Sequence, residues 1–166
     1  MIPYFVVRRR DQNGPVPTLL YGYGGFEVPL LPGYAGVRGR LWLEKGNAYV
    51  QASIRGGGEF GPAWHQAALK GNRQNGFDDF AAVAQDVVKR GIATASSLGI
   101  QGGSNGGLLT GVSLTQHPEL FGAVIIEVPL LDMLRYAELP PGASWMAEYG
   151  DPSKPEDAKW LSAYSP

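Results

Sequence analysis

Residues 98–116 read LGIQGGSNGGLLTGVSLTQ, and this stretch decides the fold that we expect. Residues 98–101 have the apolar character of a short strand, and residues 105–116 are predicted to form a helix. Between them, Gly102-x-Ser104-x-Gly106 fits the sharp strand-to-helix turn known as a nucleophile elbow. Such a turn holds the serine in a strained conformation above the sheet, so small residues must lie two positions before and after it. We therefore predict that Ser104 is a nucleophile and that the Asn105 backbone N–H faces a developing oxyanion.

Strand and helix signals alternate along the rest of the chain. The clearest helix is predicted over Phe77–Lys89, where apolar residues recur at helical spacing and Asp78 and Asp79 occupy the first turn. A nearly continuous apolar run, Gly122–Val128, is typical of a strand buried on both faces of a parallel sheet. The other predicted strands are Tyr4–Arg9, Thr18–Tyr21, Ala48–Ile54 and Leu98–Gln101. The other predicted helices are Val37–Lys45 and Asn105–Gln116. In the first of these helices, Val37 and Leu41 are expected on one face. This alternation predicts an α/β fold with a mostly parallel sheet and flanking helices. Residues 129–166 are rich in aromatic residues and proline and show no clear period after Tyr136.

Composition excludes several functional classes. The chain has 166 residues, 44% hydrophobic and 17% charged, which is enough apolar material for one folded domain. Lys and Arg number 14 against 15 Asp and Glu, so no basic surplus exists to hold nucleic acid or a membrane surface. The absence of cysteine excludes disulfides, thiolate catalysis and Cys-ligated zinc, and it leaves the compartment undecided. No metal-ligating constellation is visible in the sequence, and we expect neither a metal nor a cofactor.

A serine nucleophile needs a base, normally histidine, and the chain has two histidines. His117 lies 13 residues after Ser104, which is roughly 20 Å along a helix and too far to reach the hydroxyl. His65 precedes the serine, whereas elbow hydrolases run serine, acid, histidine along the chain, so we interpret it as a packing or loop hydrogen-bonding residue. Asp132 is better explained as a turn or capping residue. The catalytic triad therefore cannot be completed from these residues.

Several further stretches, all in one order, resemble the catalytic domain of the prolyl oligopeptidase family. Together they cover nearly the whole chain and are far more specific than the elbow alone. They are Tyr21-Gly22-Tyr23-Gly24-Gly25-Phe26, Arg55-Gly56-Gly57-Gly58-Glu59-Phe60-Gly61 with Trp64-His65, Asn75-x-Phe77-Asp78-Asp79-Phe80, Gly102 to Leu109, His117-Pro118-Glu119-Leu120-Phe121, Asp132-Met133-Leu134-Arg135-Tyr136, Glu148-Tyr149-Gly150 and Tyr164-Ser165-Pro166.

The resemblance implies an α/β-hydrolase fold and hydrolysis of short peptides on the carboxyl side of proline. It implies that Ser104 is the nucleophile, that Asn105 supplies the backbone oxyanion N–H, and that the Tyr23 hydroxyl is the second oxyanion donor. The residues implied to line the pocket for the proline ring are Phe26, Trp145, Tyr149 and Leu130. An apolar, aromatic pocket suits a ring that carries no N–H donor.

The same resemblance implies that parts of the family's enzyme lie outside these residues. The family's triad Asp and His follow the last matching segment, and its β-propeller precedes the first. We therefore expect residues 1–166 to be a partial catalytic domain that would expose an unpaired apolar sheet edge, and we expect the isolated piece to be inactive. Two alternatives remain open: a related oligopeptidase or esterase of different specificity, and an inactive α/β interaction module.

Overall fold

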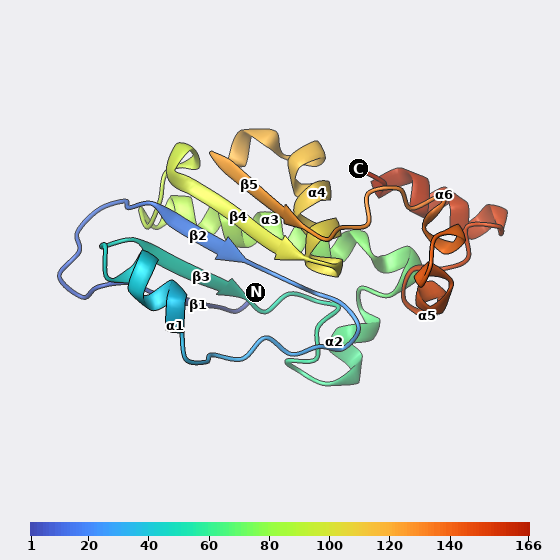
Figure 1. Ribbon diagram of the computed structural model, residues 1–166, viewed down its shortest axis with the longest axis horizontal. Helices are drawn as coiled ribbons and strands as arrows, with labels where there is room; N and C mark the ends of the chain where they lie inside the picture. The colour runs from blue at the N-terminus through green and yellow to red at the C-terminus, as the bar shows by residue number, and fades with distance from the viewer.

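A five-stranded sheet in the order β1-β3-β2-β4-β5 forms the centre of the computed structural model, which describes residues 1–166 (Figure 1). Its strands are β1 (Tyr4–Val7), β2 (Thr18–Tyr21), β3 (Ala48–Ala52), β4 (Leu98–Gly103) and β5 (Ala123–Glu127). β1 pairs antiparallel with β3, and all other neighbours are parallel. The predicted α/β fold with a mostly parallel sheet is thus confirmed. Because the carboxyl ends of β2 to β5 lie at one edge, the loops that follow them converge there.

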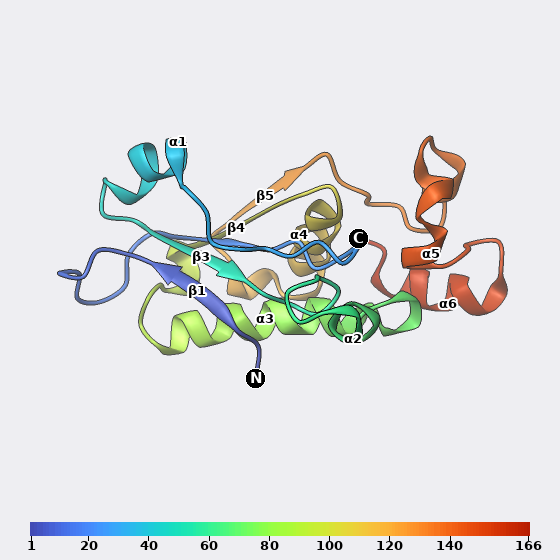
Figure 2. The same cartoon turned by 90° about the horizontal axis from the view of Figure 1, so that it is seen from below.

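The helices cover the sheet unevenly. The long helices α3 (Gln74–Lys89) and α4 (Asn105–Gln116) pack against each other on one face, and Figure 2 shows the short α1 (Gly36–Arg38) on the opposite side. Three further helices, α2 (Pro62–Gln66), α5 (Met146–Tyr149) and α6 (Pro155–Tyr164), lie beyond the carboxyl ends of the parallel strands (Figure 1). Short 3₁₀ turns occupy Lys70–Asn72, Ala95–Ser97, Pro118–Leu120, Tyr136–Glu138 and Gly142–Trp145. None of the helices has the length and apolar character needed to cross a membrane.

The core lies between the sheet and helices α3 and α4. Leu20, Val50 and Ile100 from the three central strands are fully buried, and Phe80 and Val87 of α3 pack against them. The helix predicted over Phe77–Lys89 is confirmed and begins three residues earlier, at Gln74, so Asp78 and Asp79 do not lie in its first turn as predicted. This rigid layer fixes the position of the β4–α4 turn.

Two predictions about the elements need correction, and one segment for which no element was predicted contains helices. The run Gly122–Val128 is not buried on both faces: β5 forms the sheet edge, and Ile125 is 45% exposed. The segment Val37–Lys45 does not form one amphipathic helix, because α1 continues as a π-helical turn over Gly39–Leu43, with Val37 and Leu41 exposed. Residues 129–166, which show no period in the sequence, contain the helices α5 and α6. α6 buries only Leu161 and Tyr164, which is too few contacts to produce a recognisable apolar stripe.

Candidate active site

Ser104 lies at the sharp turn between β4 and α4, with φ 56° and ψ −116°. A non-glycine residue in such a region costs about 1–3 kcal/mol, which the surrounding fold must supply. A Cβ at Gly102 would lie 2.1 Å from the carbonyl oxygen of Gly106, and one at Gly106 would lie 2.7 Å from that of Gly22. Only glycine fits at these two positions. The turn leaves the Ser104 side chain exposed at the carboxyl edge of the sheet.

Two hydrogen-bond donors lie next to Ser104. Asn105 is the first residue of α4, so its backbone N–H has no carbonyl one turn earlier to bind. Burial raises the pKa of the Tyr23 phenol above its usual value, and a hydrogen bond with the Ser104 side chain opposes this shift. The phenol therefore stays protonated at neutral pH and can donate a hydrogen bond.

A small pocket of about 120 Å³ opens beside the serine hydroxyl. Its lining consists of Tyr23, Phe26, Ser104, Leu130, Trp145 and Tyr149. The Phe26 and Tyr149 rings meet edge to face, with centroids 5.6 Å apart and an interplanar angle of 84°. The structure thus brings together all six side chains that the sequence analysis assigned to the nucleophile, the phenol donor and the proline pocket. Their roles in a reaction stay predictions.

A larger hollow of about 440 Å³ adjoins this pocket, and Ser104, Leu130 and Trp145 line both. Its other walls come from the segment after β5 and from residues 136–140. Ser104 therefore lies at the junction of a small aromatic pocket and a wider, open depression. A peptide could place one side chain in the first and extend through the second.

Neither histidine lines either cavity. The Nε2 atom of His65 lies 2.7 Å from Oε2 of Glu148, beneath the pocket, and His117 caps the far end of α4. Asp132 accepts hydrogen bonds from the backbone N–H groups of Leu134 and Arg135 and forms a turn. These placements agree with the sequence interpretation of each residue. Residues 1–166 contain no cluster of three or more side chains suited to hold a metal ion.

Sequence reasoning missed two charged residues at this site, Arg73 and Glu148. Both are almost fully buried, with 2% and 4% exposure, and Arg73 Nη1 lies 3.0 Å from Glu148 Oε1. A buried ion pair leaves no local periodicity. The available signal is the place of Glu148 beside the pocket residue Tyr149, in the family-like stretch Glu148-Tyr149-Gly150.

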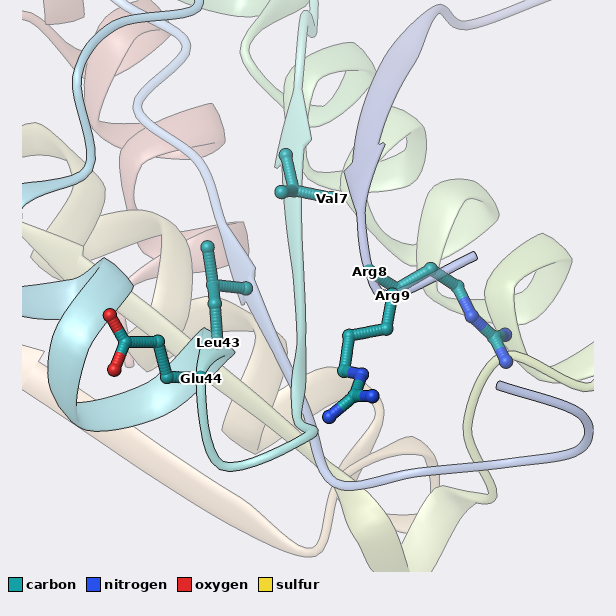
Figure 3. Close-up of a pocket in the computed structure, with 5 residues that line it drawn as sticks. All are labelled: Val7, Arg8, Arg9, Leu43 and Glu44. Atoms are coloured by element: carbon teal, nitrogen blue, oxygen red, sulfur yellow. The ribbon is translucent and has the colours of Figure 1, made fainter. Parts of the chain in front are cut away.

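A separate hollow of about 500 Å³ lies between the end of β1 and the π-helical turn, lined by Val7, Arg8, Arg9, Leu43 and Glu44 (Figure 3). The Arg8 guanidinium donates to the carbonyl oxygens of Gln12 and Gly14, and Arg9 pairs with Asp11. Both cations are thus bound to the turn that follows β1. No hydroxyl or imidazole side chain lines this hollow, so it has no candidate nucleophile comparable to Ser104.

Comparisons with known proteins agree with this geometry. An "Uncharacterized peptidase" of Sinorhizobium fredii is 55% identical over 99% of this chain, and a prolyl endopeptidase of Dictyostelium discoideum is 40% identical over 99%. The solved structure of a post-proline cleaving enzyme from Rickettsia typhi covers 99% of the chain with a TM-score of 0.97 and 49% identity. That agreement confirms the predicted α/β-hydrolase fold, as a partial domain.

The match is partial from the relatives' side. The chain spans 23% of the S. fredii protein, 22% of the D. discoideum protein and 24% of the R. typhi chain. The profile described as "Prolyl oligopeptidase family" matches residues 37–166, most of the chain. This protein chain belongs to the prolyl oligopeptidase family.

Proposed function

We propose that these residues form the nucleophile-bearing part of a serine peptidase that hydrolyses short peptides on the carboxyl side of proline. The observation that carries the proposal is the 120 Å³ pocket, in which the elbow serine, a phenol and four apolar or aromatic side chains meet. Membership of the prolyl oligopeptidase family supports it, as do the names of the relatives, which describe prolyl endopeptidase and post-proline cleaving activity.

In the proposed reaction, the Ser104 hydroxyl oxygen attacks the carbonyl carbon of the proline residue, and a base takes the hydroxyl proton. The carbonyl oxygen becomes an oxyanion that accepts hydrogen bonds from the Asn105 N–H and the Tyr23 hydroxyl. Collapse of this intermediate expels the amine, which receives the proton, and leaves an acyl ester on Ser104. Water then hydrolyses the ester in the reverse sequence of proton transfers.

The base lies outside residues 1–166 in this proposal, since His65 is bonded to Glu148 and His117 ends a 12-residue helix. We expect further polypeptide to bring a histidine and its carboxylate partner to the open side of Ser104. Without them, residual turnover would rest on the oxyanion donors and substrate binding alone, several orders of magnitude below that of a complete triad.

The proline ring is the side chain that suits the pocket best. The ring is compact and apolar, and its nitrogen carries no N–H within a peptide, so shape and aromatic contact must select it. The polar side-chain groups of the residues that line the pocket are the Ser104 hydroxyl, the two phenols and the indole N–H of Trp145. One of these, the Tyr149 hydroxyl, donates to Asn105 Oδ1 at 2.7 Å. No carboxylate lines the pocket to attract a basic side chain.

The test is labelling by a fluorophosphonate probe in the protein expressed from its full reading frame. We expect labelling that disappears in Ser104→Ala and persists in Ser96→Ala, whose exposed serine lies at the opposite end of β4. The same protein, assayed without the probe, should cleave a fluorogenic peptide after proline and not after arginine. Labelling that survives Ser104→Ala would refute the nucleophile, and a complete absence of Ser104-dependent chemistry would favour the non-catalytic interaction module.

A further inference from the structure

Directly beneath the pocket lies a set of five polar side chains, His65, Arg73, Asn105, Glu148 and Tyr149, which we call the buried network. Glu148 is its centre. One carboxylate oxygen accepts hydrogen bonds from the Phe26 backbone N–H at 2.9 Å and from Arg73 at 3.0 Å, and the other lies 2.7 Å from His65 Nε2. The carboxylate therefore contacts three separate parts of the chain.

The network continues to the elbow through Arg73. Its second guanidinium nitrogen donates to Asn105 Oδ1, which also accepts the Tyr149 hydroxyl at 2.7 Å. The other end of the Asn105 amide donates to the carbonyl oxygen of Tyr23 at 2.5 Å. Asn105 is thus held through its side chain, while its backbone N–H stays available beside Ser104.

These contacts join elements that are distant in sequence. Glu148 is 122 residues from Phe26, and Asn105 is 82 residues from Tyr23. Phe26 forms one wall of the pocket, Trp145 and Tyr149 form another, and Tyr23 and Asn105 are the proposed oxyanion donors. One carboxylate therefore fixes the pocket walls relative to the donors.

A buried ion pair is a poor means of gaining stability, because desolvation of the two charges offsets their attraction. Its hydrogen bonds, however, are directional in a way that apolar packing is not. From this geometry we infer that Glu148 is a positioning residue. It holds the Phe26 loop and helix α5 at the distance from Ser104 at which a bound proline carbonyl meets both oxyanion donors. The catalytic meaning of this inference rests on the proposed function, whereas the coupling of the segments does not.

A positioning role has a kinetic signature that differs from that of a pocket wall. When the walls shift relative to the elbow, the proline ring still binds but its carbonyl is misplaced, so kcat falls while KM changes little. A misplacement of about 1 Å can lower the rate by about 100-fold. We expect Glu148→Ala to lower kcat for a proline peptide by about 10- to 100-fold with KM within about threefold. Glu148→Gln retains an oxygen for the Phe26 N–H but loses the charge that strengthens this hydrogen bond, so it should recover most, but not all, of this loss.

The structure offers a matched control in Asp79. Like Glu148, it is a buried carboxylate that pairs with an arginine and accepts a hydrogen bond from a backbone N–H. In this case both the guanidinium and the backbone N–H belong to Arg55. It lines neither cavity at Ser104. We expect Asp79→Asn to lower the melting temperature as Glu148→Gln does and to leave kcat within about twofold, because its bonds do not reach the oxyanion donors.

A second measurement requires no activity and uses the protein expressed from its full reading frame. Amide hydrogen exchange followed by NMR should show faster exchange at Phe26, and shifted signals at Tyr23 and Asn105, in Glu148→Gln but not in Asp79→Asn. If Glu148→Ala does not fold, Glu148→Gln carries the kinetic test with an expected kcat loss of about threefold.

The outcomes separate the two proposals. If the wild-type protein is active and its Glu148 variants keep the wild-type kcat, or differ only by a raised KM, the positioning role is overturned and the proposed function stays intact. An inactive wild-type protein counts against the proposed function, and the amide signals then decide the inference on their own. Unchanged signals at Phe26, Tyr23 and Asn105 in Glu148→Gln overturn it.

Discussion

Substitution of Gly102 by alanine adds one methyl group at the most crowded point of the elbow. The new Cβ would lie 2.1 Å from the Gly106 carbonyl oxygen, 2.5 Å from its carbonyl carbon and 2.9 Å from its Cα. All three atoms belong to the backbone of the first turn of α4, so no side-chain rotation can relieve the clash. The helix start must move away from β4 by about 1 Å, and Ser104, which lies between the two glycines, must move with it.

The cost can be estimated from this geometry. Forcing one methyl group into a packed interior typically destabilises a protein by about 1–3 kcal/mol, and a backbone obstacle places the variant at the upper end. We expect the free energy of unfolding to fall by about 3 kcal/mol, which for a chain of this size lowers the melting temperature by about 6–12 °C. The neighbouring Gly103 is the control, since a Cβ there would meet no atom closer than Glu127 Cβ at 3.7 Å. Gly103→Ala should be neutral or stabilising by less than about 1 kcal/mol.

Urea denaturation of the two variants and the wild-type chain, followed by circular dichroism, measures both effects. The same methyl group is added at adjacent positions of one strand, so strand propensity largely cancels and the difference isolates the contact with Gly106. If the two variants unfold within about 0.5 kcal/mol of each other, the close approach of Gly102 and Gly106 does not fix the elbow, and our account of how Ser104 is held is wrong.

Two further predictions concern the pocket and its surroundings. Trp145→Ala should lower kcat/KM for a proline peptide by about tenfold, which is equivalent to about 1.4 kcal/mol of lost ring contact. The same substitution should lower kcat/KM for the matching alanine peptide by less than about threefold. Equal losses for the two peptides would show that Trp145 does not belong to the proline pocket. Burial raises the pKa of Tyr136 to about 12, against about 10 in an unfolded chain, so the folded state holds this proton more tightly. The resulting stabilisation is complete below pH ~10 and is lost as the pH rises toward ~12. Tyr136→Phe should therefore lose less of its free energy of unfolding at alkaline pH than the wild-type chain does, as measured by urea denaturation. An unchanged loss would contradict the raised pKa of Tyr136.

The elements that the sequence predicted well are those with a strong local cause. Helix α3 repeats apolar residues at helical spacing. Of the five residues on this predicted apolar face, Phe80, Val83, Ala84 and Val87 are buried, and Val88 is half-buried. The elbow was predicted because a steric rule acts over only five residues, and the clash distances at Gly102 explain that rule. In both cases the interactions that decide the structure lie within one element or one turn.

Predictions failed where the deciding partner is distant in sequence. The apolar composition of β5 indicated burial on both faces, but burial depends on what lies next to a strand, and β5 pairs only with β4. Val37 and Leu41 have helical spacing, yet the segment lies on the side of the sheet away from α3 and α4, so its apolar face stays exposed. An apolar pattern reports that a segment can be buried and does not identify the surface that would cover it.

The candidate active site has features that the sequence could predict and others that depend on partners distant in sequence. Parallel strand order places the loops after β2, β4 and β5 at one edge, so the approach of Tyr23, Ser104 and Leu130 follows from topology once the strands are assigned. Nothing local predicts that Glu148 reaches both the Phe26 loop and His65, because these contacts span 122 and 83 residues. Topology brings the loops to the same edge, but the distances among them depend on directional bonds such as those of Glu148. Activity should therefore tolerate changes of apolar volume in the sheet better than the loss of a single buried hydrogen bond beneath Ser104.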